Sequence, residues 1–299
     1  MTREGPVSED LRARIMAAAD RLRYRPNLAA RALASRRSGL VGMVIDDLGD
    51  AILSGIVQAA QGSLERRGYG TLVALNAGRE GTTGPIDSLL ARGAEAVLFA
   101  GRSPTPIEVE ALGAKGLPWI ALCEDQGDDA SIWDAGRGRG AELACRYLLD
   151  LGHERLGALL GGQGASRLAE SLAKAGSPVT LAEVAPEEDP SAIRSAVRSL
   201  LDLPGAPTAI VCRSDRCALI ALRECASRGV RIPQDLSVVG FGDEPFARYC
   251  HPALTTIRVA AGEIGRQSGD ALAGRIAGAS TERHAAGVKV IVRETTGPR

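Results

Sequence analysis

The stretch "PTAIVCRSDRCALIALRECASRGVRIPQDLSVVGFGD" (207–243) decides the fold class, because it contains one complete repeat of alternating elements. It begins with a short apolar run at 208–212 and ends with a second apolar run at 236–241. Between them, residues 215–228 have apolar side chains at helical spacing. Two apolar strands joined by a crossover helix predict a strand–helix–strand unit, in which the two strands are parallel.

The same alternation extends in both directions from residue 39 onward. The sequence predicts eight apolar strands, at 39–45, 70–76, 94–100, 118–123, 155–161, 179–184, 208–212 and 236–241. Helical patterns lie between them, among them 51–67, 137–151, 189–202 and 215–228. The fold class is therefore α/β, and eight strands favour two doubly wound parallel-sheet lobes with a cleft. A closed eight-stranded α/β barrel is the competing architecture. Residues 254–278 read as an extended segment and a helix that carries the chain back to the first lobe.

Residues 1–40 differ in charge from the rest of the chain. They contain nine arginines and four acidic residues, whereas the remaining 259 residues carry 27 basic and 32 acidic residues. We expect a helix over about 8–23 that is capped by Ser8, and a short helix over 28–36 that is capped by Asn27. Such a basic arm is typical of a segment that contacts a polyanion, although arginine-rich helices are also common on solvated surfaces.

Composition and motifs exclude several functions. We find no apolar run of membrane-spanning length and no export signal, which together predict a cytoplasmic chain. The six scattered cysteines predict buried free thiols, and we expect neither a metal site nor a cofactor. Nucleotide-binding loops and a nucleophile elbow are missing, because the two glycine-rich segments at 161–166 and 240–245 both leave G-x-G-x-x-G incomplete. We therefore expect that the protein is not an enzyme.

Four segments in the same order resemble the lac repressor (LacI/GalR) family of transcription regulators. They are the junction at 7–48, "LLDLGHERLGALLGG" (148–162), the opening stretch at 207–243 and "PALTTIR" (252–258). The resemblance implies a core of two periplasmic-binding-protein-like lobes (type I), homodimerisation through that core, and a small-molecule effector, such as a sugar or related metabolite, between the lobes. It also implies operator DNA as the partner of the N-terminal segment.

In that family the segment after "YRPN" is a hinge helix that folds on operator DNA, and a leucine from it wedges into the minor groove. Leu33 matches that leucine, and an ordinary apolar contact with the core is the alternative for it. Arg31, Arg36 and Arg37 are expected to contact flanking phosphates. Tyr24 and Asn27, at the start of the hinge segment, complete the predicted DNA-binding set. Residues 1–8 align with the loop after the recognition helix, so about two helices of the family's helix-turn-helix are missing from the sequence as written.

The effector-binding residues implied by the resemblance are mostly polar. Arg167 matches the family's arginine near the start of the second lobe. Ser214 and Asp215 match an "ND" pair, and Asp243 follows Gly242 in a "GFDD"-like turn. Asp47 and Leu53 lie in the region after the first strand, where the family carries an aromatic "NPFF"-like turn. For Arg167 and Asp215, a salt bridge across the cleft or a helix cap is an equally good interpretation.

Together these observations predict four regions and one function. Residues 1–26 are the headpiece remnant, 27–38 the hinge helix, 39–158 with 259–278 the N-terminal lobe, and 159–258 with 279–299 the C-terminal lobe. The predicted function is a DNA-binding regulator, a repressor, whose operator affinity depends on the effector. The alternative is an intracellular ligand-binding dimer without sequence-specific DNA binding of its own.

Overall fold

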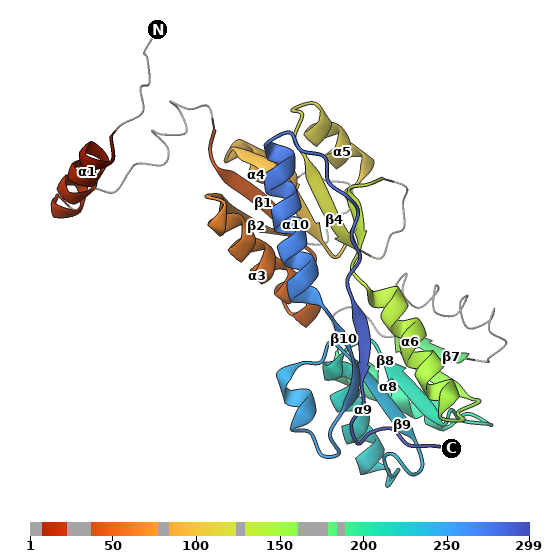
Figure 1. Cartoon of the computed structure of the whole chain (residues 1–299). Coiled ribbons are helices and arrows are strands. Elements are labelled where there is room, and N and C mark those ends of the chain that lie inside the picture. The colour runs from red at the N-terminus through yellow and green to blue at the C-terminus, as the bar shows by residue number, and fades with distance from the viewer. Residues whose placement is uncertain (1–7, 23–36, 77–83, 124–128, 161–178, 184–188) are drawn as a thin grey trace. The chain divides into compact units, whose positions relative to one another are not determined.

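The computed structural model describes residues 8–22, 37–76, 84–123, 129–160, 179–183 and 189–299 of the chain (Figure 1). By its internal contacts the chain divides into two units, residues 1–39 and residues 40–299. In the first unit, α1 (Glu9–Arg21) confirms the predicted N-terminal helix. The Leu11 amide donates to Ser8 Oγ at 3.3 Å, which places Ser8 in the predicted capping position.

The first lobe of the second unit is built on a five-stranded parallel sheet with the order β2-β1-β3-β4-β5. Its strands are β1 (Leu40–Ile45), β2 (Gly70–Leu75), β3 (Ala94–Ala100), β4 (Trp119–Cys123) and β5 (Ile132–Asp134). Side chains of β1 alternate between two cores: Met43 and Ile45 pack in one cluster with α3 (Ala51–Arg66) and α10 (Ala261–Ile276), whereas Val44 packs in another. The latter cluster includes side chains of α4 (Gly84–Ala91) and α5 (Pro106–Gly113). Burial on both faces explains why these strands are apolar without interruption.

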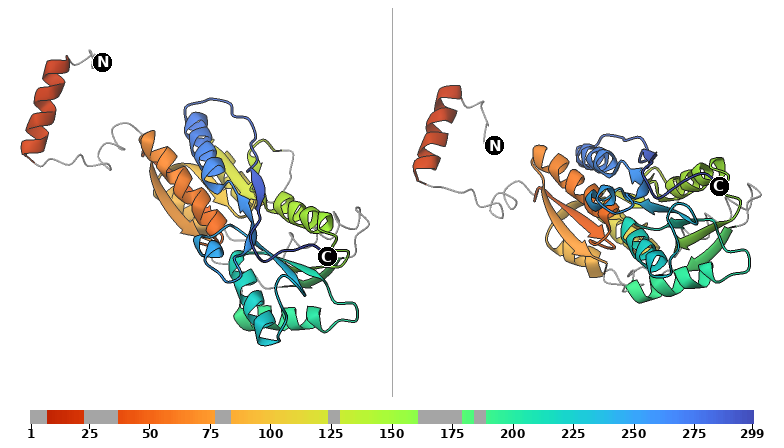
Figure 2. Two further views of the ribbon diagram at one scale, coloured as in Figure 1. Left: turned by 60° about the horizontal axis from the view of Figure 1, so that its bottom comes forward. Right: turned by 90° about the horizontal axis from the view of Figure 1, so that it is seen from below.

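Helices α3 and α10 lie side by side on the first lobe (Figures 1 and 2). Two glycines of α10 permit this approach. A Cβ atom on Gly265 would lie 2.3 Å from the backbone oxygen of Ile56, and one on Gly269 would lie 2.7 Å from that of Ala60. Because backbone atoms cannot move aside as a flexible side chain does, the closeness of the two helices depends on these glycines.

The second lobe is built on a six-stranded sheet with the order β11-β10-β9-β8-β6-β7. Its strands are β6 (Leu156–Leu160), β7 (Val179–Glu183), β8 (Ala209–Cys212), β9 (Ser237–Phe241), β10 (Thr255–Val259) and β11 (Val288–Ile291). All pairs are parallel except β10 with β11. Helix α6 (Arg137–Asp150) packs on β10 and β11, and α8 (Pro190–Leu201) packs against α9 (Asp215–Ser227). A short 3-10 helix, η1 (Pro245–Arg248), follows β9.

The two open sheets confirm the doubly wound lobes and exclude the closed barrel. All eight predicted strands are present, and β5, β10 and β11 are additional. The return helix α10 packs on α3 of the first lobe, as residues 259–278 were expected to do. The chain was predicted to cross from the first lobe to the second at residue 158, but the structure has this crossing earlier. It lies between β5 and α6, because α6 and β6 both belong to the second lobe.

Candidate functional site

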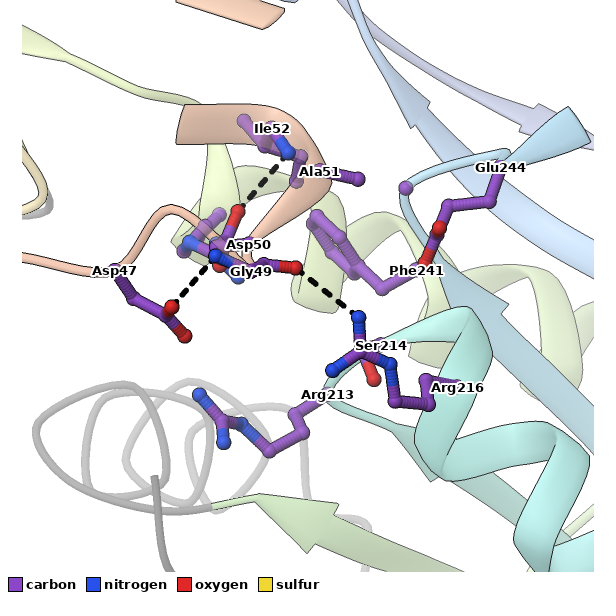
Figure 3. Close-up of a pocket in the computed structure, with 12 residues that line it drawn as sticks. Asp47, Gly49, Asp50, Ala51, Ile52, Arg213, Ser214, Arg216, Phe241 and Glu244 are labelled. Atoms are coloured by element: carbon purple, nitrogen blue, oxygen red, sulfur yellow. Dashed lines mark hydrogen bonds and ion pairs between the residues drawn. The ribbon is translucent and has the colours of Figure 1, made fainter. Parts of the chain in front are cut away.

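A pocket lies between the two lobes, at the ends of strands where open α/β sheets bind ligands. The lining residues come from the turn after β1 and the start of α3, from the start of α6, and from the segments after β8 and β9. They are Asp47, Gly49, Asp50, Ala51, Ile52, Arg137, Arg213, Ser214, Arg216, Phe241, Gly242 and Glu244 (Figure 3). Three of these side chains are guanidinium groups and three are carboxylates, so the lining is strongly charged.

On the first lobe, the acidic side chains that line the pocket accept hydrogen bonds from nearby backbone amides. Asp50 caps α3, because its Oδ1 accepts hydrogen bonds from the amides of Ile52 at 2.9 Å and Leu53 at 3.0 Å. Asp47 Oδ1 accepts from the Gly49 amide at 2.7 Å. These local bonds fix the turn that follows β1 and hold both carboxylates at the pocket wall.

On the second lobe, the lining is built around helix starts. Ser214 caps α9, and its Oγ accepts from the Cys217 amide at 2.9 Å. Arg216 lies in the first turn of the same helix, and Arg137 is the first residue of α6. A cation in the first turn of a helix is disfavoured by the helix dipole. A basic side chain at these two positions therefore destabilises its helix, unless a carboxylate or carbonyl oxygen outside the helix binds it.

Two contacts of these arginines join the lobes. Arg137 Nη2 forms an ion pair with Asp50 Oδ2. Figure 3 shows the second contact, in which Arg216 Nη2 donates to the carbonyl oxygen of Gly49 at 3.2 Å. The pocket has a cavity volume of about 40 Å³. Ligand pockets for drug-sized molecules typically measure about 300–1,000 Å³. The space that the described residues leave between the two lobes is therefore smaller than a typical metabolite site.

Behind the pocket wall, Asp215 is fully buried and serves the second lobe itself. Its carboxylate accepts hydrogen bonds from the Thr256 hydroxyl at 2.5 Å and from the Glu244 amide at 2.6 Å. Burial raises the pKa of Asp215 to about 6, although both hydrogen bonds act in the opposite direction. A Cβ atom on Gly240 would lie 2.3 Å from Asp215 Oδ1, so β9 needs a glycine beside this carboxylate.

Asp243 forms a second internal cluster next to Asp215. Its side chain is 4% exposed and makes ion pairs with Arg258 of β10 and with Arg293 near the C-terminus. The backbone at Asp243 has a φ of 53°, in the left-handed region, and this conformation follows Gly242 at a φ of 126°. The turn thereby directs the Asp243 carboxylate to two arginines of its own lobe.

The structure brings only part of the predicted effector set together. Asp47 and Ser214 line the pocket, Asp215 and Asp243 lie next to it with their carboxylates bound internally, and Leu53 is buried in the core of the first lobe. Arg167 lies outside the described residues. Sequence reasoning did not propose Asp50, Arg137, Arg213, Arg216 or Glu244. A basic residue in the first helical turn after a strand, as at Arg137 and Arg216, is the signal that was available.

Most of the predicted DNA-binding set lies outside the described residues as well, namely Tyr24, Asn27, Arg31, Leu33 and Arg36. Arg37 is described and is exposed. These assignments remain predictions.

The cysteines are free, and five of the six are buried, as predicted. Burial raises the pKa of Cys145 to about 12 and that of Cys225 to about 11, which keeps both thiols protonated at neutral pH. Within the described ranges, no three His, Cys, Asp or Glu side chains come together as metal ligands. In those same ranges, no helix combines the length and the hydrophobicity that a membrane span requires.

The chain is similar to a family of binding domains and to two transcriptional repressors. The family model for periplasmic binding protein-like domains matches residues 145–296. The HTH-type transcriptional repressor CytR of Escherichia coli K12 is 28% identical over 275 residues, which cover 88% of this chain and 80% of the repressor. The HTH-type transcriptional repressor PurR of Escherichia coli O139:H28 is 29% identical over 287 residues, 90% of this chain and 83% of the repressor.

A solved structure extends the similarity to nearly the whole chain. The complex of the transcriptional regulator CelR with cellobiose superposes with a TM-score of 0.74 at 26% identity. The match covers 97% of this chain and 91% of that regulator.

Proposed function

Because this chain belongs to the lac repressor family of transcriptional regulators, we propose that a small molecule bound between its two lobes controls its affinity for operator DNA. Its core is a member of the periplasmic binding protein-like family. Relatives named as repressors, together with a sugar-bound regulator of the same fold, support the role of a repressor without catalytic activity.

The observation that carries the proposal is the cleft, whose wall includes polar side chains of both lobes. The lobes are connected by three chain passages, before α6, between β10 and α10, and between α10 and β11. A ligand that separates or closes the lobes therefore changes the position of β1, the strand that follows directly on the N-terminal unit. If the two hinge segments of a dimer must meet in order to fold, this displacement changes operator affinity.

We also propose that the chain acts as a homodimer. An apolar groove of about 300 Å³ on the second lobe is lined mainly by α9 and the segment after η1, and includes Leu219, Leu222, Val230, Ile232 and Pro252. Leu219 is 43% exposed, and Tyr249 beside this segment is 80% exposed. A second copy of the chain would cover these side chains. Leu219→Glu is then expected to convert dimer to monomer in sedimentation velocity, and an unchanged dimer would place the interface elsewhere.

The proposed function is tested by selecting duplexes from a random-sequence DNA library with the full chain. A regulator enriches one operator-like sequence, and its affinity for that sequence falls steeply with salt because phosphate contacts release counterions. Leu33→Ala should weaken binding to the selected sequence and leave non-specific binding nearly unchanged, as expected for a side chain that wedges into one base step.

Two results would contradict parts of this account. A library that yields no enriched sequence would indicate a ligand-binding protein without DNA recognition of its own. Equal affinity of the parent and Leu33→Ala for the selected sequence would remove the wedge assignment only.

A further inference from the structure

We propose that the effector carries an anionic group, a carboxylate or a phosphate, which binds the arginines of the second lobe in place of their contacts with the first lobe. The inference rests on the proposed function and specifies the chemical class of its effector. It follows from an unequal distribution of charge between the two walls of the cleft.

Among the described residues that line the pocket, the three arginines, Arg137, Arg213 and Arg216, belong to the second lobe. Figure 3 shows the Arg213 and Arg216 side chains together below the turn that contains Asp47 and Gly49. Glu244 is the single acidic residue that the second lobe adds among the described lining. This wall therefore has an excess of positive charge, and the first turns of α6 and α9 add the positive ends of two helix dipoles. Gly136, the N-cap of α6, provides no side-chain cap.

The acidic residues of the first lobe do not depend on these arginines. Asp50 Oδ1 keeps its two bonds to the start of α3, and Asp47 keeps its bond to Gly49, however the lobes are placed. By contrast, a hydrogen bond of Arg216 and an ion pair of Arg137 both cross the cleft. Opening the lobes breaks these two contacts, so Arg137 and Arg216 each lose an acceptor of the first lobe that an entering anion can replace.

A carboxylate or phosphate is the group that replaces them best, because two parallel N–H groups of a guanidinium match two oxygens of such an anion. An uncharged sugar gains less from this wall. Among the described lining residues, the aromatic ring is that of Phe241, which is 5% exposed and offers little face for stacking. The anion would occupy the position that Asp50 Oδ2 and the Gly49 carbonyl have in the closed form.

The test compares matched pairs of neutral and anionic compounds with the full chain. We would measure the thermal unfolding midpoint with ribose against ribose 5-phosphate, glucose against gluconate, and inorganic phosphate alone, with ionic strength equalised by sodium chloride. The proposal predicts that at least one anion raises the midpoint by about 5 °C at a hundredfold excess over its Kd, whereas its neutral counterpart does not at equal concentration. The phosphate and carboxylate arms show which anion the site prefers.

Arg216→Gln should reduce this shift at least by half, and Arg213→Gln should do the same. Arg146→Gln is the control, since Arg146 is an exposed arginine of α6 outside both this pocket and the proposed dimer groove and should retain the full shift.

The proposal is overturned if no anion in the set raises the midpoint, if neutral sugars raise it equally, or if Arg216→Gln and Arg213→Gln both retain the shift. None of these outcomes affects the proposed function, which the DNA library tests independently.

Discussion

Two groups of charged side chains lie close to each other in this protein and have different roles. The Asp243 group joins β10, the turn after β9 and the C-terminal segment, all within the second lobe. The Arg137–Asp50 pair joins the second lobe to the first. Asp243 is 4% exposed, whereas the side chains of Arg137 and Asp50 are 21% and 17% exposed.

The comparison distinguishes ion pairs that persist when the lobes move from ion pairs that a ligand in the cleft can replace. The partners of the Asp243 group move together when the lobes move, and water is largely excluded from the pair of Asp243 with Arg293. An ion pair between lobes competes with solvent and with any ligand that enters the cleft. We therefore expect the first group to determine stability and the second to determine the distribution between open and closed forms.

The largest expected effect is at Asp243. Asp243→Ala leaves Arg293, whose side chain is only 14% exposed, without its carboxylate, and we expect the free energy of unfolding to fall by about 3 kcal/mol in denaturant titrations. Asp235→Ala is the matched control, because Asp235 pairs with Arg231 on the surface and should cost about 1 kcal/mol or less. Similar losses in both variants would show that the burial of Asp243 adds nothing to the stability that its ion pairs provide.

The next effect is a dependence on pH through Asp215. Its pKa in the folded chain is about 6, above its usual value of 3.8, so the folded state holds a proton that the unfolded state has lost in this interval. Raising the pH from 4 to 6 should therefore lower the free energy of unfolding by about 2 kcal/mol through this group.

His153 acts in the opposite direction, because burial lowers its pKa and the folded chain gains stability as pH rises to 6.5. Asp215→Asn isolates the contribution of Asp215 from that of His153. The difference in unfolding free energy between the parent and this variant should change with pH between pH 4 and 6. Parallel curves from pH 4 to 6 would show that Asp215 titrates normally.

The smallest effect on stability is expected at the cleft. Arg137→Ala should change the free energy of unfolding by about 1 kcal/mol or less, because the pair is partly exposed and spans two lobes. Its effect should appear in the radius of gyration, which we expect to increase in small-angle X-ray scattering as the lobes separate. A variant that is strongly destabilised with unchanged dimensions would mean that this pair is structural.

The sequence was sufficient for most of the fold but only for part of the site. Strands such as β1 and β8 are apolar on both faces, so their pattern identifies them without tertiary information. The three-residue β5 and the late β11 gain their strand character from pairing with β4 and β10. Short segments of this kind carry too little pattern to be recognised alone.

Within the site, the sequence indicated which residues lie near the pocket better than it indicated where their side chains point. The family resemblance placed Asp47 and Ser214 in the predicted effector set, and both line the pocket. Asp243 was placed in the same set, but the left-handed turn directs its carboxylate to Arg293, 50 residues further on. Arg137 was missed because its partner Asp50 is 87 residues away, and only the closure of the lobes brings the two together.

The most direct test of a cleft that controls DNA binding is the affinity of Arg137→Ala for the sequence selected by the parent chain. Fluorescence anisotropy over a range of salt concentrations separates the two contributions to this affinity. The account predicts at least a tenfold change in affinity with an unchanged salt dependence, since the variant alters the lobes and not the phosphate contacts. Identical affinities, in a variant whose lobes have opened in solution, would contradict coupling between the cleft and DNA.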